Sequence, residues 1–203
     1  MRIVVPLRRE SLRMVLRWTQ RAFFAGAALI LAYCTYVPLD AWFFQRQQSR
    51  ELERLWTTTA SRTTPPAVAV ADGLIGRIEI PRLGVSAIVI EGSGTSTLRR
   101  AVGHIHGTAL PGQVGNVGIA GHRDTYFRPL RNIRKDDIIE LTTLLGAYRY
   151  RVVSTAVVGP SDVGVLDPGR NETLTLVTCY PFYFVGSAPG RFIVRAERVG
   201  NAS

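Results

Sequence analysis

The chain has 203 residues, of which 46% are hydrophobic, so it can bury a core and is not a disordered polymer. A chain of this length is typical of one domain with appendages. Its net charge of +10 would suit a nucleic-acid-binding protein, but six arginines and one glutamate in residues 1–21 supply half of that excess. Because nucleic-acid binding requires a basic face on the folded part, we do not expect nucleic acid as a partner.

The first predicted element is a transmembrane helix at residues 22–39, AFFAGAALILAYCTYVPL, which carry no charge. As a helix they would extend about 27 Å, close to the thickness of the hydrocarbon core of a bilayer. Arginines precede this segment and Asp40 follows it, so the positive-inside rule predicts a cytoplasmic tail at residues 1–21 and an extracytoplasmic remainder. The alternative is a cleaved signal peptide, which the long basic region and the lack of a small-residue cleavage site disfavour.

Residues 40–73 are expected to connect this helix to a folded domain. Charged residues at helical spacing in 45–56 predict a stalk, and the Thr-, Ala- and Pro-rich residues 57–73 predict a spacer. Short apolar runs separated by Gly and Pro follow, at a spacing typical of a β-barrel or sandwich. We therefore expect one all-β domain over residues 74–199, with a short tail at 200–203. The expected strands are IGRIEI, VSAIVIEG, NVGIAG, DIIELTT, AYRYRVVSTAVV, TLTLVT and RFIVRAERV, and the expected short helices are TSTLRRAVGHI (95–105) and YFRPLRNI (126–133).

Cys179 stands at the end of the alternating run TLTLVT, and Pro181 follows it. A buried cysteine usually acts as a small hydrophobe, which is the structural interpretation. The other cysteine, Cys34, belongs to the apolar segment and cannot come close enough to Cys179 for a disulfide. An unpaired thiol outside the cytoplasm is either an oxidation liability or a reactive group, so at this point both interpretations stay open.

A cysteine nucleophile requires a base or an imidazolium partner, and the chain has three histidines. His122 follows an apolar strand and Gly121, as Cys179 follows its own strand, so two strands are expected to bring both side chains to one end of a barrel. His104 and His106 lie in a Gly/Pro loop with no predicted strand before it. Zinc is the alternative use of these histidines, but their spacing and the absence of HExxH disfavour it, so we expect no metal and no cofactor.

Arg191 begins the last predicted strand, twelve residues after Cys179, and the loop between them holds two prolines and two glycines. If the two strands are antiparallel neighbours, Arg191 lies beside Cys179, where a guanidinium can donate to a carbonyl oxygen that becomes an oxyanion. The alternative is a solvent-exposed arginine at the barrel rim, which is what we expect for Arg195 and Arg198.

These motifs together resemble the sortases: TALPG and GHRDT around His122, and TLVTCYPF followed by APGR around Cys179 and Arg191. The resemblance covers roughly residues 74–199, and TCYPF with APxR is most similar to class D sortases. It implies a closed eight-stranded β-barrel preceded by one transmembrane helix. It also implies a cysteine transpeptidase held by a single pass in the bacterial cell membrane, with its catalytic domain outside the cytoplasm.

Members of this family cleave a C-terminal sorting signal, usually an LPxTG-like pentapeptide, between Thr and Gly, and pass the acyl group to an amine. The resemblance thus implies Cys179 as nucleophile, His122 as acid and base, and Arg191 as ligand of substrate and oxyanion. Thr178 is implied as a residue that helps to position the substrate carbonyl. The implied partners are surface proteins with an LPxTG-like signal, an amine acceptor and the lipid bilayer.

The chain departs from the family where the family often has Gly-Asp after the short helix, because it reads Lys135-Asp136-Asp137. Two other functions are alternatives. A transpeptidase of cell-wall peptide stems would place its histidine close before the cysteine, whereas here His122 and Cys179 are 57 residues apart. A membrane-tethered β-barrel scaffold without activity is the second alternative.

Overall fold

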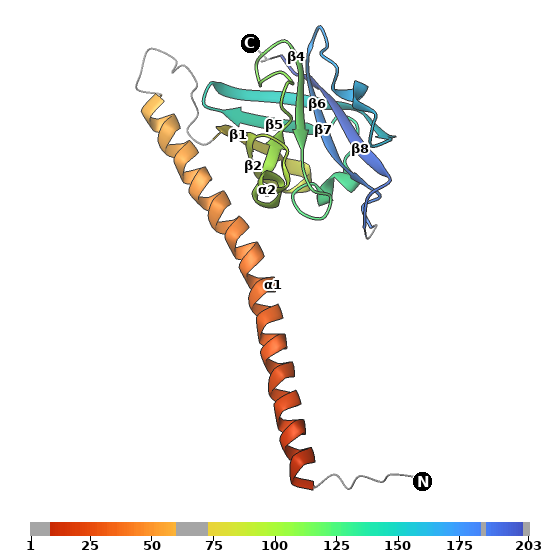
Figure 1. Cartoon of the computed structure of the whole chain (residues 1–203). Helices are drawn as coiled ribbons and strands as arrows, with labels where there is room; N and C mark the ends of the chain where they lie inside the picture. The colour runs from red at the N-terminus through yellow and green to blue at the C-terminus, as the bar shows by residue number, and fades with distance from the viewer. Residues whose placement is uncertain (1–8, 60–72, 184–185, 201–203) are drawn as a thin grey trace. The chain divides into compact units, whose positions relative to one another are not determined.

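The structure is a computed structural model that describes residues 9–59, 73–183 and 186–200 (Figure 1). It divides into two compact units, Met1–Trp42 and Phe43–Ser203. The elements in chain order are α1 (Arg9–Thr59), β1 (Leu74–Ile80), η2 (Pro81–Leu83), β2 (Val85–Glu91), α2 (Thr95–Arg100), β3 (Val102–His104), β4 (Gly115–Ala120), η3 (Arg128–Asn132), β5 (Ile138–Thr143), β6 (Gly146–Val158), η4 (Val163–Leu166), β7 (Glu172–Tyr180) and β8 (Gly190–Arg198).

α1 contains the whole predicted apolar segment, residues 22–39, and its apolar side chains are exposed. Of the helices in the described residues, only α1 is long and apolar enough to cross a membrane. Most of the predicted spacer, residues 60–72, lies outside the described residues.

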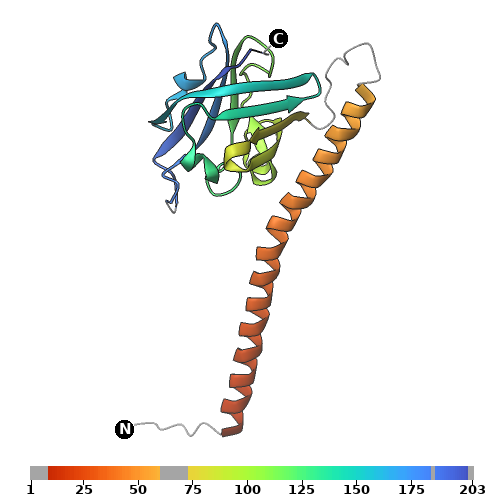
Figure 2. The same ribbon diagram turned by 180° about the vertical axis from the view of Figure 1, so that it is seen from behind.

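The strands form a closed barrel in the order β1-β2-β3-β4-β7-β8-β6-β5, which confirms the expected all-β fold. The pairs β2–β3 and β4–β7 are parallel, and the other pairs are antiparallel. Figure 2 shows the barrel from behind, with the long β5–β6 hairpin in cyan. Buried and less buried positions alternate along β1 and β5, as expected for strands that bury one face.

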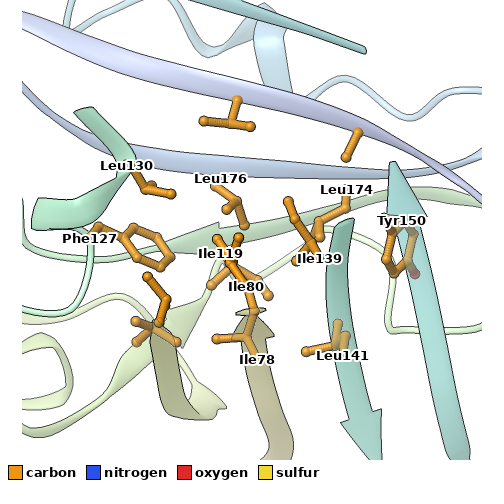
Figure 3. Close-up of a cluster of buried hydrophobic side chains, with 14 of the residues drawn as sticks. Ile78, Ile80, Ile119, Phe127, Leu130, Ile139, Leu141, Tyr150, Leu174 and Leu176 are labelled. Atoms are coloured by element: carbon orange, nitrogen blue, oxygen red, sulfur yellow. The ribbon is translucent and has the colours of Figure 1, made fainter. Parts of the chain in front are cut away.

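The barrel interior is filled by aliphatic side chains from the strands, with Phe127 and Leu130 at one side of the cluster and Tyr150 at the other (Figure 3). Burial raises the pKa of Tyr150 to about 12, so its phenol stays neutral within the core at physiological pH. The fully buried residues labelled in Figure 3 are Ile78, Ile80, Ile119, Phe127, Leu130, Ile139, Leu141, Tyr150, Leu174 and Leu176.

The prediction of one helix over residues 95–105 was wrong in its second half. α2 ends at Arg100, Ala101 is extended, and β3 begins at Val102. β3 has three residues, so it offers no alternation that a sequence pattern could reveal. The second predicted helix, residues 126–133, is the short 3₁₀ helix η3.

The turn before β5 contains the departure from the family's Gly-Asp pattern. Asp136 has φ = 70°, and it is the only non-glycine residue with positive φ in the part of the chain that the structure describes. The Asp137 carboxylate accepts hydrogen bonds from the Arg82 guanidinium and from the Arg134 backbone N–H, the latter at 2.8 Å. The Arg82 hydrogen bond holds the pKa of Asp137 below its usual range. The backbone of Asp136, with φ = 70°, lies in the left-handed region, which glycine adopts without strain.

The last part of α1 packs against the barrel within the second unit. Leu52 is fully buried in a small cluster with Leu74 and Ile88. The Gln45 side chain donates to the Arg100 carbonyl at 2.7 Å and accepts from the Ile88 backbone N–H at 2.9 Å. The stalk thus shares a small hydrophobic cluster with β1 and β2, a contact that the sequence pattern did not indicate.

Candidate active site

Cys179 lies on the outer face of the barrel near the end of β7. Leu174 and Leu176 belong to the buried core, so alternation along the strand places Val177 and Cys179 on the opposite face. Cys179 is half-buried and has no disulfide partner. A thiol in this position is accessible to a reactant on the barrel surface while the strand holds its backbone in place.

His122 follows β4, which runs parallel to β7. Ala120 pairs with Val177, and beyond the end of β4 the Gly121 N–H still donates to the Val177 carbonyl at 3.1 Å. β4 ends at Ala120, so His122 follows two residues after the last paired residue. The strands that precede the two residues are therefore neighbours, as predicted, and the closeness of the imidazole and the thiol stays a prediction.

The end of β4 faces outward before the chain turns. Val117 and Ile119 on β4 belong to the core cluster, so alternation directs Ala120 to the outer surface, and His122 follows two residues later, beyond the strand. His122 is half-buried, as Cys179 is. An imidazole just beyond β4 and a thiol near the end of the adjacent β7 are the residue types that a cysteine nucleophile requires.

Arg191 lies directly opposite Cys179 on β8, because β7 and β8 are antiparallel neighbours in that register. Residues opposite each other in such a pair project to the same face, so the guanidinium lies on the thiol's side of the sheet. Its Nη1 donates to the Gly190 carbonyl at 3.1 Å and to the Ala188 carbonyl at 3.5 Å. Within the described residues its other N–H groups have no acceptor, so they remain available to a ligand.

Thr178 is buried, with 2% of its surface exposed, and its hydroxyl donates to the Gly121 carbonyl at 2.8 Å. This bond links β7, just before Cys179, to Gly121, just before His122. A contact between Thr178 and the substrate stays a prediction.

The other two histidines both contact the carboxylate of Glu91. His104 is the last residue of β3 and is buried, so the expectation that no strand precedes it was wrong. Its Nδ1 lies 2.7 Å from a Glu91 carboxylate oxygen and its Nε2 lies 3.0 Å from the Ala109 carbonyl oxygen. The side chain of His106 is 93% exposed and its Nδ1 lies 3.1 Å from the other Glu91 oxygen. Across residues 9–59, 73–183 and 186–200, no group of three His, Cys, Asp or Glu side chains is placed to hold a metal ion.

Two loops border the outer surface of β4 just before the histidine. A Cβ at Gly118 would lie 3.0 Å from side-chain atoms of both Leu166, in η4, and Thr108, in the loop after β3. Asn116 Nδ2 donates to the Val165 carbonyl at 3.1 Å, which anchors the loop between β6 and β7. Side chains of η4 and of the loop after β3 therefore pack closely over β4 at Gly118, four residues before His122.

Arg195 is exposed, as expected, but Arg198 is not a solvated rim residue. The Arg198 guanidinium lies 3.3 Å from a Glu172 carboxylate oxygen and 5.1 Å from the ring centroid of Tyr148. Its partners lie on β7 and β6, the two strands that flank β8, and the sequence pattern does not reveal them.

Comparison with known proteins agrees with this geometry. Residues 78–199 match the family model of the sortase domain. The chain belongs to the sortase family. It is 35% identical over 125 residues to Sortase D of Bacillus subtilis (strain 168), an alignment that covers 61% of this chain and 63% of that protein. The predicted likeness to class D sortases agrees with this similarity.

Solved sortase structures share the barrel. The Sortase D5 transpeptidase of Clostridium perfringens is 29% identical with a TM-score of 0.61, and the match covers 77% of this chain and 96% of that one. Sortase A of Listeria monocytogenes is 28% identical with a TM-score of 0.58, over 64% of this chain and 89% of the other. The chain spans 50 to 63% of the length of the first three curated relatives that it matches.

Proposed function

We propose that this sortase is a membrane-anchored cysteine transpeptidase that cleaves a C-terminal, LPxTG-like sorting signal and transfers the acyl group to an amine at the cell surface. The observation that carries the proposal is the backbone register, which pairs Cys179 with Arg191 and sets the end of β4, two residues before His122, beside β7. Family membership supports the reaction class.

In the first half of the reaction, the Cys179 thiolate attacks the carbonyl carbon of the threonine in the signal. The tetrahedral oxyanion accepts hydrogen bonds from Arg191, which lies opposite Cys179 on β8. The C–N bond then breaks, and the leaving amine of the glycine takes a proton from the His122 imidazolium. The product is a thioester between the substrate threonine and Cys179.

In the second half, an acceptor amine enters and His122 removes a proton from it as the nitrogen attacks the thioester carbonyl. Collapse of the second tetrahedral intermediate expels the Cys179 thiolate, so the enzyme returns to its starting state. The new amide bond replaces the one that was cleaved, and no cofactor is needed for the balance.

The helix α1 supports membrane attachment. Its apolar residues 22–39 follow a basic segment, so the positive-inside rule orients residues 1–21 toward the cytoplasm and the barrel outward. Confinement of enzyme and membrane-held precursor to one surface raises their effective concentration. The proposed location is the bacterial cell membrane, with surface proteins and an acceptor amine as partners.

The test is to incubate the full chain in detergent with a library of LPxTG-type peptides and a primary-amine acceptor. Mass spectrometry should detect a thioester on Cys179 and a peptide–acceptor product. Cys179→Ala should abolish both, while the matched variant Cys34→Ser should keep both. No thioester with any peptide would refute the proposed function and favour the inactive scaffold, and turnover by Cys179→Ala would refute the assignment of the nucleophile.

A further inference from the structure

Arg123 follows His122 directly, and its side chain reaches the loop between β7 and β8. Its Nη1 donates to the Pro181 carbonyl at 2.9 Å and its Nη2 donates to the Gly186 carbonyl at 3.1 Å. These acceptors lie 58 and 63 residues away in the sequence. One half-buried guanidinium thus holds two backbone groups of a distant loop.

The position of this contact links both parts of the candidate site. Pro181 comes two residues after Cys179, and Gly186 precedes the start of β8, where Arg191 lies. Arg123 therefore connects the turn that contains His122 to the segment between Cys179 and Arg191. The two hydrogen bonds leave from the two terminal nitrogens of one planar group, a geometry that lysine cannot reproduce.

The histidine needs such a connection, because the strand pairing that aligns it ends one residue earlier. The last bonds between the two strands are those of Gly121 with Val177 and Thr178. After Gly121 the chain turns, and the His122 carbonyl accepts from the Phe127 N–H at 3.1 Å. This turn fixes the histidine relative to its own segment and not relative to the cysteine.

We propose that Arg123 is a positioning residue, which sets the separation of the His122 imidazole and the Cys179 thiol by holding the β7–β8 loop against the histidine turn. The inference rests on the proposed function of this site. A displacement of about 1 Å between reacting groups can cost on the order of 10²-fold in rate. The two hydrogen bonds of Arg123 go to backbone carbonyls of the loop, so the proposed effect on the reaction passes through the position of His122.

The first experiment compares Arg123→Gln and Arg123→Lys with Arg128→Gln, which removes the same charge from an exposed side chain nearby. We expect Arg123→Gln to lower kcat about 10²-fold with KM within about threefold, and Arg123→Lys to recover only part of the loss. Arg128→Gln should match wild type. A kcat within about threefold of wild type in folded Arg123→Gln would overturn the proposal, as would global unfolding of both Arg123 variants.

The second experiment needs no peptide substrate and so separates this inference from the proposed function. The alkylation rate of Cys179 by iodoacetamide is measured for wild type, Arg123→Gln, His122→Ala and the double variant, all in the Cys34→Ser background. If Arg123 acts through His122, both single variants change the rate in the same direction, and Arg123→Gln has no further effect once His122 is alanine. Additive effects, or no effect of Arg123→Gln, would overturn the proposal even if the wild-type enzyme cleaves sorting peptides.

Discussion

Arg191→Lys tests the role of Arg191, because it keeps the positive charge and removes the planar fork of donors. In the structure one nitrogen of the guanidinium donates to the carbonyls of Gly190 and Ala188. These contacts restrain the guanidinium, and Arg191 lies opposite Cys179 on β8. A lysine ammonium has one nitrogen, so it cannot keep the Gly190 contact and present donors at the same second position.

The expected size of the effect follows from these contacts. Loss of one oxyanion donor typically costs about 2.7–4 kcal/mol, or roughly 10²–10³-fold in rate. The positive charge that lysine keeps recovers part of this transition-state stabilisation. We therefore expect the cleavage rate to fall by at least about 30-fold, equivalent to about 2 kcal/mol. Both backbone contacts of Arg191 are local, one and three residues away. The free energy of unfolding should therefore change by less than about 0.5 kcal/mol.

The assay is steady-state cleavage of a fluorogenic sorting peptide, with urea denaturation of the same samples. Arg195→Lys is the matched control, because Arg195 lies four residues along the same strand and is exposed. Wild-type kinetics for a fully folded Arg191→Lys would refute the reasoning. An equal loss in Arg195→Lys would show that replacing any arginine on β8 has this effect and that position 191 is not special.

Three further outcomes are expected. His122→Ala should lower kcat/KM by about 10²–10⁴-fold, whereas His106→Ala, whose side chain is 93% exposed, should stay close to wild type. In urea titrations the free energy of unfolding of Asp136→Gly should be about 1 kcal/mol larger than that of Asp136→Ala, because glycine is unstrained at φ = 70° and alanine is not. Equal stability of the two variants would contradict this. Arg82 lowers the pKa of Asp137, so the stabilisation exists above the unfolded carboxyl pKa of about 3.9 and is lost as pH falls through the lower folded value. Asp137→Asn should therefore lower the urea midpoint at pH 7, and the difference from wild type should shrink toward pH 2.

The strands around the candidate site were largely predictable because each has a clear pattern in the sequence, and Cys179 and Arg191 lie near the ends of two of them. The end of TLTLVT located Cys179, and the start of RFIVRAERV located Arg191. His104 was misplaced because β3 is too short to produce a pattern. Its partner Glu91 belongs to β2 and lies 13 residues away, so local sequence gives no sign of their contact.

Contacts that depend on which strands become neighbours could not be predicted. Arg198 was expected in solvent, but β8 lies between β6 and β7, which supply it with tyrosine rings and the carboxylate of Glu172. Arg123 donates to backbone carbonyls, and a carbonyl has no signature in the sequence. Leu52 follows the pattern of a solvated stalk, yet it is fully buried by β1 and β2.

The parallel pairing of β4 with β7 joins strands that are far apart in the sequence, so the proposed site can assemble only after this pairing forms. Between these strands the chain forms β5 and β6, and β8 must still add to both β6 and β7 before the barrel is complete. Such long-range pairings form late in folding, since the entropy of closing long loops is lost before the contacts are gained. Under the proposed function, Cys179 therefore has no base beside it until these pairings form. Synthesis of the thiol and assembly of the proposed site are then separate events in the life of the chain.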